Sequence, residues 1–328
     1  MLQFKKLVRL GLILGVLVVF FGLINLSQPL EVQSQSGIVV DHTSVDLFDD
    51  IPEQYIQAAA NLRMLFIDRS VGGNISDALD CLNYPSDEVA PSSCKRYEHV
   101  VPAFSADPSE VNWSRVGGYE RQNWDYLYWD DTLDCGTWSQ KVGCFFEMVN
   151  PVISQYDVVS YQFSYLEVDQ GSSIADQPGG FFWNNPTLQD VYDLEAYEAQ
   201  HSNKLFIYWT TSLARSIGTT TSESFNDQMR QYALANNKVL FDVADILSHD
   251  PTGNPCYDNR DSVPYDNGNN FENHPDDGQN IPAICQHYTT ETEGGHLGSV
   301  STGGIRVAKA FWVLMAQLAG WTPSGHTP

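Results

Sequence analysis

The stretch LRMLFID, residues 62–68, decides the fold, because it reads as a buried strand that runs directly into a turn and a helix. A short apolar run bounded by turn residues favours a strand that is covered on both faces. Residues 71–82 predict the helix, and Gly72 and Gly73 lie at its start. Ser70 therefore stands where the first predicted strand ends and the next helix begins.

Strand and helix patterns alternate along much of the chain. The predicted elements are a helix at 51–60, the strand at 62–68, a helix at 71–82, a strand at 156–165, a helix at 187–201, a strand at 204–210, a helix at 222–236, a strand at 238–242 and a helix at 300–319. Such alternation implies a parallel sheet with helices on both faces. We therefore expect an α/β fold, a flavodoxin-like three-layer α/β/α domain with a central parallel sheet. Residues 81–150 and 248–290 are predicted to be two irregular, disulfide-stapled insertions.

The N-terminus differs in kind from the rest of the chain. Lys5, Lys6 and Arg9 precede an apolar run over residues 10–24, a pattern typical of a signal peptide or signal anchor. A buried core helix is the alternative, and cleavage is left open. The predicted organisation is a signal peptide or anchor at 1–26, a polar spacer at 27–50, one domain at 51–321 and a tail at 322–328.

The chain is strongly acidic, with 41 Asp and Glu residues, 17 Lys and Arg residues and a formal net charge of −24. Such a surface repels phosphate groups, so a nucleic-acid partner is excluded. Contact with a membrane is expected only through the N-terminal segment.

The six cysteines fit an exported protein in an oxidising compartment. Pairing in sequence order closes the shortest loops and predicts Cys81–Cys94, Cys135–Cys144 and Cys256–Cys285. Zinc is the competing interpretation, but no C-x-x-C or clustered His-Cys spacing supports it, so no metal and no cofactor is predicted. For the acidic stretch 258–277, a solvated loop is expected, with a calcium site as the alternative.

Hydroxyl side chains occur at or just past the predicted strand ends, where the loops of a parallel sheet form the ligand crevice. They are Ser70, Ser164, Thr210 and Thr211. A serine becomes a nucleophile when an imidazole takes its proton, and the imidazole needs an acid to orient it. Glu293 can reach His296 across the tight turn Gly294-Gly295, just before the last helix. The alternative for Ser70 is a helix N-cap.

An early serine followed by a late acid-x-x-histidine is the chain order of the GDSL/SGNH hydrolases, which this chain resembles over residues 51–321. Asp68-Arg69-Ser70 stands where that family has Gly-Asp-Ser, and Glu293 stands where the family has aspartate. Segments 238–246 and 306–312 also resemble secreted bacterial members. The resemblance implies a serine esterase with Ser70 as nucleophile, His296 as general base and Glu293 as the acid that orients it.

The family's two other sequence blocks supply donors to the oxyanion hole. Gly118 stands for the glycine block. Where the family has Gly-x-Asn-Asp, this chain has Gln162, which shares a strand face with Ser164. Asn123 and Asn74 are alternative donors. The loss of one oxyanion donor typically costs about 10²–10³ in rate.

Aromatic side chains are frequent between residues 113 and 138, and such rings suit stacking on the apolar faces of sugars. The alternative is that they form the core of an irregular insertion. We expect Trp124, Tyr128 and Tyr165 to contact the substrate, a small ester or an acylated polysaccharide from which acetyl groups are removed outside the cell. The alternative function is a catalytically idle relative that binds glycan at the cell surface.

Overall fold

The computed structural model describes residues 37–86, 88–91, 94, 117–130, 132–213, 219–258, 278–285, 288–289, 297 and 301–323, and the backbone of 264–266 and 271–273. The predicted signal peptide or anchor at 1–26 lies outside these residues. So does most of the acidic stretch 258–277, for which a solvated loop is predicted and a calcium site is the alternative. No helix within the described part of the chain is long and apolar enough to cross a membrane.

A six-stranded sheet forms the centre of the domain, and every pair of neighbouring strands is parallel. The strands are β1 (Val39–Val40), β2 (Met64–Asp68), β3 (Trp124–Tyr128), β4 (Val158–Tyr161), β5 (Leu205–Trp209) and β6 (Val239–Phe241), and their order in the sheet is β1-β6-β5-β4-β2-β3. From β3 to β6 this is the flavodoxin-like order, with β1 added at one edge. The predicted parallel α/β fold is confirmed.

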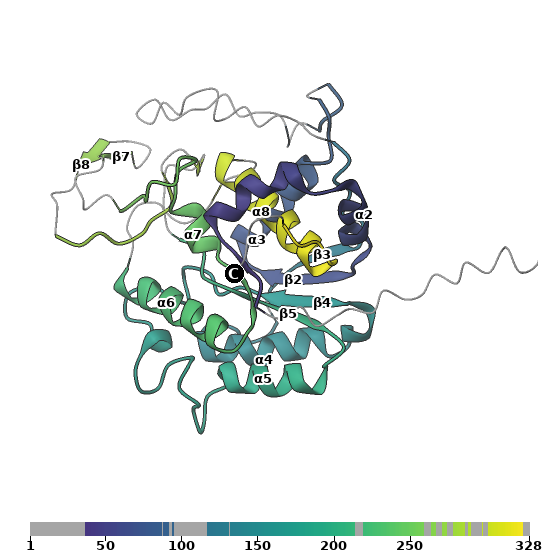
Figure 1. Ribbon diagram of the computed structural model, residues 1–328. Coiled ribbons are helices and arrows are strands. Elements are labelled where there is room, and N and C mark those ends of the chain that lie inside the picture. Colours follow the sequence, from purple (N-terminus) through teal and green to yellow (C-terminus); the bar gives the residue numbers. More distant parts are fainter. Residues whose placement is uncertain are drawn as a thin grey trace, which may run out of the picture. The chain divides into compact units, whose positions relative to one another are not determined.

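Helices cover both faces of the sheet and make the three layers seen in Figure 1. One layer holds η1 (His42–Asp50), α2 (Glu53–Asn61), α3 (Ser70–Cys81) and α8 (Thr302–Leu318), and the other holds α4 (Trp138–Val149), α5 (Val191–Gln200) and α6 (Thr220–Ala235). The remaining elements are η3 (Ile153–Gln155), η4 (Ser173–Ala175), α7 (Val243–Leu247) and a small hairpin of β7 (Pro264–Asp266) and β8 (Phe271–Asn273).

Alternate side chains of the strands fill two separate cores. Leu65 and Ile67 of β2 pack into the cluster that includes Phe145 of α4. Phe66 points to the other face, where its ring stacks on Trp209 with the centroids 4.5 Å apart. All five β2 residues are buried, as expected for a strand in the middle of a parallel sheet.

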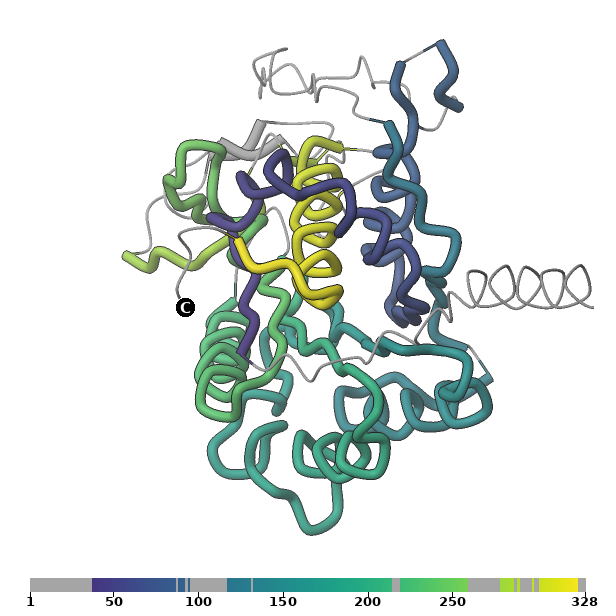
Figure 2. Tube along the Cα trace, turned by 45° about the vertical axis from the view of Figure 1, so that its right-hand side comes forward, coloured from purple at the N-terminus to yellow at the C-terminus, as the bar shows by residue number. Residues whose placement is uncertain are grey.

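The chain from residue 37 onward belongs to the domain, which corrects the predicted spacer at 27–50. Val40 lies in β1, which pairs with β6, and it has no exposed surface. Phe48 of η1 is 1% exposed, and η1 runs beside α8 (Figure 2). Arg306 of α8 donates to the carbonyl of His42. The polar composition of this segment gave no sign that Val40, Val45 and Phe48 are buried and anchor it to the domain.

The stretch 81–150, predicted to be irregular, contains both a strand and a helix. β3 pairs with β2 from Met64↔Trp124 to Asp68↔Tyr128. α4 begins with a capping box in which Thr137 and Gln140 each bond the other's backbone amide. The irregular part is therefore shorter than predicted.

The three predicted disulfides are confirmed: Cys81–Cys94, Cys135–Cys144 and Cys256–Cys285. These pairs account for every cysteine of the chain, so zinc ligation by the cysteines is excluded in this state. Three disulfides indicate an oxidising compartment.

We expect the double substitution Cys135→Ser and Cys144→Ser to lower the free energy of unfolding by about 3 kcal/mol, because the disulfide removes the loop-closure entropy of a short loop from the unfolded chain. Urea unfolding of both proteins measures this difference. Thiol titration of the denatured, unreduced wild type should find no free thiol, and a stoichiometric free thiol would contradict the pairing.

Candidate functional site

The carboxyl ends of β2 and β4 mark the topological switch point of the sheet. The chain passes from β2 to β3 on one side of β2 and then returns to β4 on the other side. Loops that leave neighbouring strands in opposite directions open a crevice, and ligands of open α/β proteins bind there. The segments that follow β2 and β4 bring Asp68, Arg69, Ser70, Ser164 and Glu167 to this edge.

Ser70 is the first residue of α3 and follows the end of β2 after one residue, Arg69. Arg69 is the N-cap of α3 and gives it no side-chain hydrogen bond. The first amides of a helix have no acceptor within the helix, so the start of α3 is electropositive.

The last helix, α8, packs closely on α3. Gly304 in the first turn of α8 lies against Ala78 of α3, since a Cβ on Gly304 would be 3.4 Å from that of Ala78.

Asp68 is a buried carboxyl group beneath the first turn of α3. It has no exposed surface, and neither side-chain oxygen makes a well-aligned hydrogen bond with a described residue. Burial raises the pKa of Asp68 to about 7; the nearby amides of Arg69 and Gly72 lower this pKa in part, and the charge of Glu167 raises it. An acid that is half protonated near neutral pH is thus placed two residues before Ser70.

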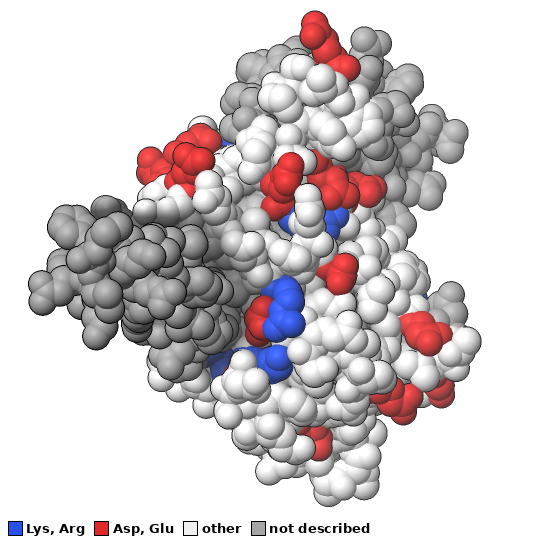
Figure 3. All heavy atoms as spheres, turned by 90° about the vertical axis from the view of Figure 1, so that its right-hand side faces the viewer, with Lys and Arg blue, Asp and Glu red and all other residues white. Residues whose placement is uncertain are grey.

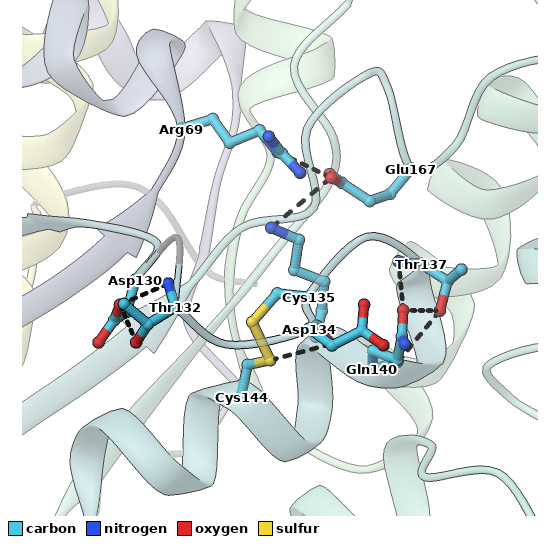
Figure 4. The surroundings of a disulfide bond; sticks show 10 residues. Arg69, Asp130, Thr132, Asp134, Cys135, Thr137, Gln140, Cys144 and Glu167 are labelled. Atoms are coloured by element: carbon cyan, nitrogen blue, oxygen red, sulfur yellow. Dashed lines mark hydrogen bonds and ion pairs between the residues drawn. A yellow bond between two sulfur atoms is a disulfide. The ribbon is translucent and has the colours of Figure 1, made fainter.

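Glu167 connects the two strand ends (Figure 4). Its Oε1 accepts from Arg69 Nε at 2.9 Å and lies 3.6 Å from Lys141 Nζ. Its Oε2 accepts from both the amide and the hydroxyl of Ser164, at 2.8 and 2.6 Å. A buried carboxylate with this many donors is held in one position.

Lys141 reaches the same carboxylate from α4 and has no exposed surface. Its Nζ lies 4.0 Å from the centroid of the Trp129 ring and makes no hydrogen bond with a described residue. Burial lowers the pKa of Lys141 to about 8, and the charge of Glu167 opposes that fall. The disulfide Cys135–Cys144 ties the turn of α4 that carries Lys141 to the segment after β3 (Figure 4).

The structure describes only part of the predicted catalytic set. Ser70 lies at the switch point, whereas His296 and Glu293 lie outside the described residues. The helix that follows His296 in the sequence, α8, is described and packs along α3, the helix that Ser70 begins.

Two predicted oxyanion donors lie at the wrong end of the sheet. Asn123 and Gly118 precede β3, and the Asn123 carbonyl accepts from the amide of Met64, the first residue of β2. Because the strands are parallel, this is the amino edge, opposite to Ser70. The Asn123 side chain instead donates to the carbonyl of Ala60. These two assignments are corrected.

Gln162 lies at the carboxyl edge, but its side chain is fully buried. Its Nε2 donates to the carbonyl of Thr210 at 3.0 Å, which directs the amide towards β5. Thr210 and Thr211 are likewise buried, and their hydroxyls bond Asp242 and the carbonyl of Phe163. These groups connect strand ends to one another.

The predicted substrate contacts have different outcomes. Trp124 is a core residue, 3% exposed, whose Nε1 donates to the carbonyl of Ala59 and whose ring lies 4.4 Å from that of Trp312; its assignment is corrected. Tyr128, by contrast, is 48% exposed at the end of β3 and lies close enough to the Arg69 guanidinium to help raise its pKa. Tyr165 follows β4 and is half-buried. Tyr128 thus lies beside Arg69 and Ser70.

The start of α3 tolerates no side chain at residue 72. A Cβ on Gly72 would lie 2.6 Å from the Cβ of Asp68 and 2.7 Å from Cε2 of Tyr126, whereas a Cβ on Gly73 would find its nearest neighbour at 3.6 Å. We expect Gly72→Ala to lower the free energy of unfolding by about 1–3 kcal/mol. Gly73→Ala is the matched control. Equal stability of the two variants in urea unfolding would contradict this packing.

A second group of titratable side chains lies at the other end of the same edge, after β1 and β6. His42 Nδ1 is 2.5 Å from Asp245 Oδ2, and the rings of His42 and His249 stack with centroids 3.9 Å apart. Among the described residues, these three are the group whose ligand atoms are close enough to hold a metal ion. The nearly parallel rings do not direct two nitrogen lone pairs at one point, so the arrangement is better suited to mutual packing.

Comparisons of the chain with protein-family models, with curated proteins and with solved structures gave no match.

Proposed function

We propose that the protein is an exported serine ester hydrolase of the SGNH type and that Ser70 is its nucleophile. The observation that carries the proposal is the position of Ser70. It begins a helix directly after an internal strand of a parallel sheet, at the switch point where such folds bind ligands. Arg69, and not Ser70, is the N-cap of α3, so the N-cap alternative for Ser70 is corrected.

In the proposed reaction, Ser70 Oγ attacks the ester carbonyl and His296 takes the hydroxyl proton. Glu293 orients the imidazole and stabilises its positive charge. The backbone amide of Ser70, at the electropositive start of α3, stabilises the oxyanion. The alcohol then leaves with the proton from His296, and water releases the acid from Ser70 in the reverse sequence of steps. The roles of His296 and Glu293 rest on the sequence.

The proposed substrate is an ester outside the cell, either a small ester or an acylated polysaccharide. The disulfides and the basic, then apolar, N-terminal segment support export. The proposed membrane contact is limited to that segment.

The direct test is hydrolysis of short acyl esters, such as 4-nitrophenyl acetate, by the purified full-length chain. Turnover that depends on Ser70 supports the proposal. If no short ester is hydrolysed while acetylated glycan binds, the catalytically idle glycan-binding alternative replaces it.

A further inference from the structure

Arg69 is a cation next to the proposed nucleophile, and one edge of its guanidinium is already fixed. Its Nε donates to Glu167 Oε1, and 27% of the side chain is exposed. Within the described residues, Glu167 is the only carboxylate that pairs with Arg69. The exposed Tyr128 lies near this guanidinium and helps to raise its pKa. A guanidinium held in this way is preorganised to bind a carboxylate from solution.

The charged side chains around Arg69 carry more positive than negative charge. Arg69 and Lys141 share the single carboxylate of Glu167. Asp68 is the other acid nearby, and burial raises its pKa to about 7, so it is largely protonated in mildly acidic solution. Lys141, with a pKa of about 8, is then charged. Arg69, Lys141 and Glu167 together carry one net positive charge under these conditions.

This positive site stands out in a protein whose formal net charge is −24. On the face shown in Figure 3, acidic side chains are widespread, and most of the basic side chains lie beside acidic ones. Arg63 pairs with Asp157 at the amino edge of the sheet. Long-range repulsion by the acidic surface would weaken the binding of any anion, so an anionic group needs a local, partly desolvated cation to bind here.

The same cluster borders a hollow that can hold a sugar-sized group. Its volume is about 470 Å³, within the range of small-molecule sites, and Glu167 forms part of its wall. The start of α4 and the loop after β4 supply most of the rest, including Trp138, Leu166 and Ser172, and Leu188 before α5 completes it. Arg69 does not itself line the hollow; the buried Glu167, which bonds Arg69, connects the two.

We propose that Arg69 binds a carboxylate of the substrate beside the scissile ester, so that the preferred substrates are anionic esters, such as acylated acidic polysaccharides. This inference rests on the proposed esterase function and specifies its substrate class. Arg69 has a binding role here, and Glu167 and Lys141 position it.

The test compares two probes that differ in charge, 4-nitrophenyl acetate and the mono-4-nitrophenyl ester of succinic acid. We expect kcat/KM to be at least tenfold higher for the succinate ester, and Arg69→Gln to reduce this ratio to about one. Arg69→Lys, which keeps the charge and loses the fork of donors, should fall between them. The matched control is Arg63→Gln, which removes an exposed ion pair at the opposite edge and should leave the ratio unchanged.

A binding measurement separates this inference from the esterase proposal. Calorimetric titration with monomethyl succinate should detect binding to Ser70→Ala and to Arg63→Gln, and at least tenfold weaker binding to Arg69→Gln. If the two nitrophenyl esters are hydrolysed equally well, the anionic preference is wrong and the esterase stands. If neither is hydrolysed but Arg69-dependent binding is measured, the esterase is wrong and the anion subsite stands.

Discussion

Asp68→Asn is expected to stabilise the protein at pH 8 and to have little effect at pH 4. The carboxyl group of Asp68 is fully buried and has no well-aligned hydrogen bond to a described residue, so its charged form is disfavoured and its pKa rises to about 7. In the unfolded chain the pKa returns to the ordinary value of 3.8. The folded protein therefore keeps a proton that the unfolded chain releases between these two pH values.

The sign and size of the effect follow from this difference. Below about pH 4, Asp68 is protonated in both states, and its ionisation does not lower the free energy of unfolding. As the pH rises to about 7, the unfolded chain alone loses the proton, so the free energy of unfolding falls. Each pKa unit corresponds to about 1.4 kcal/mol, so the loss amounts to about 4 kcal/mol. Asparagine has the same shape and no charge, and the advantage of Asp68→Asn should grow by that amount between pH 4 and pH 8.

Urea unfolding at the two pH values measures this change. The control is Asp169→Asn at an exposed position in the loop after β4, which should alter the free energy of unfolding by less than about 0.5 kcal/mol at either pH. An Asp68→Asn effect that does not vary with pH would show that Asp68 ionises normally in the folded protein.

The second large effect is expected on catalysis. Ser70→Ala removes the proposed nucleophile and should lower kcat on short acyl esters at least hundredfold, as should His296→Ala, because neither half of the pair acts alone. Glu293→Gln should cost less, since the imidazole remains in place. Ser154→Ala, at an exposed serine in η3 near the amino edge, is the matched control and should retain full activity. More than a tenth of wild-type activity in Ser70→Ala would exclude Ser70 as nucleophile.

The central strand and the helix after it were predictable from the sequence because they carry strong local signals. β2 is a continuous apolar run, and α3 follows it after a single residue. The three disulfides were predictable because each pairs nearest neighbours in the sequence. In these cases, nearby residues determine the structure.

β3 and α4 were missed although both have local signals. α4 begins with the capping box of Thr137 and Gln140, and Val142, Phe145 and Val149 lie on its buried side. The many aromatic residues around them favoured an irregular insertion instead. Without β3, the sequence could not show that Asn123 precedes a strand and so lies at the amino edge, which explains the wrong oxyanion assignments.

The charged cluster could not be predicted, because its members are distant in sequence and only the fold brings them together. Lys141 lies on α4, in which Glu147 is the only other charged residue. Glu167 lies in a loop. Nothing in the local sequence shows that both side chains are buried. The short strand β1 likewise gains its stability from pairing with β6, about 200 residues later.

The most direct test of the account is to map the site of reaction with a fluorophosphonate. The full-length protein is treated with the probe, digested and analysed by mass spectrometry. We predict one adduct per chain, on the peptide that contains Ser70, and no adduct on Ser70→Ala, with circular dichroism showing that the variant is folded. An adduct on another residue, or equal labelling of Ser70→Ala, would contradict the assignment of Ser70 as the nucleophile.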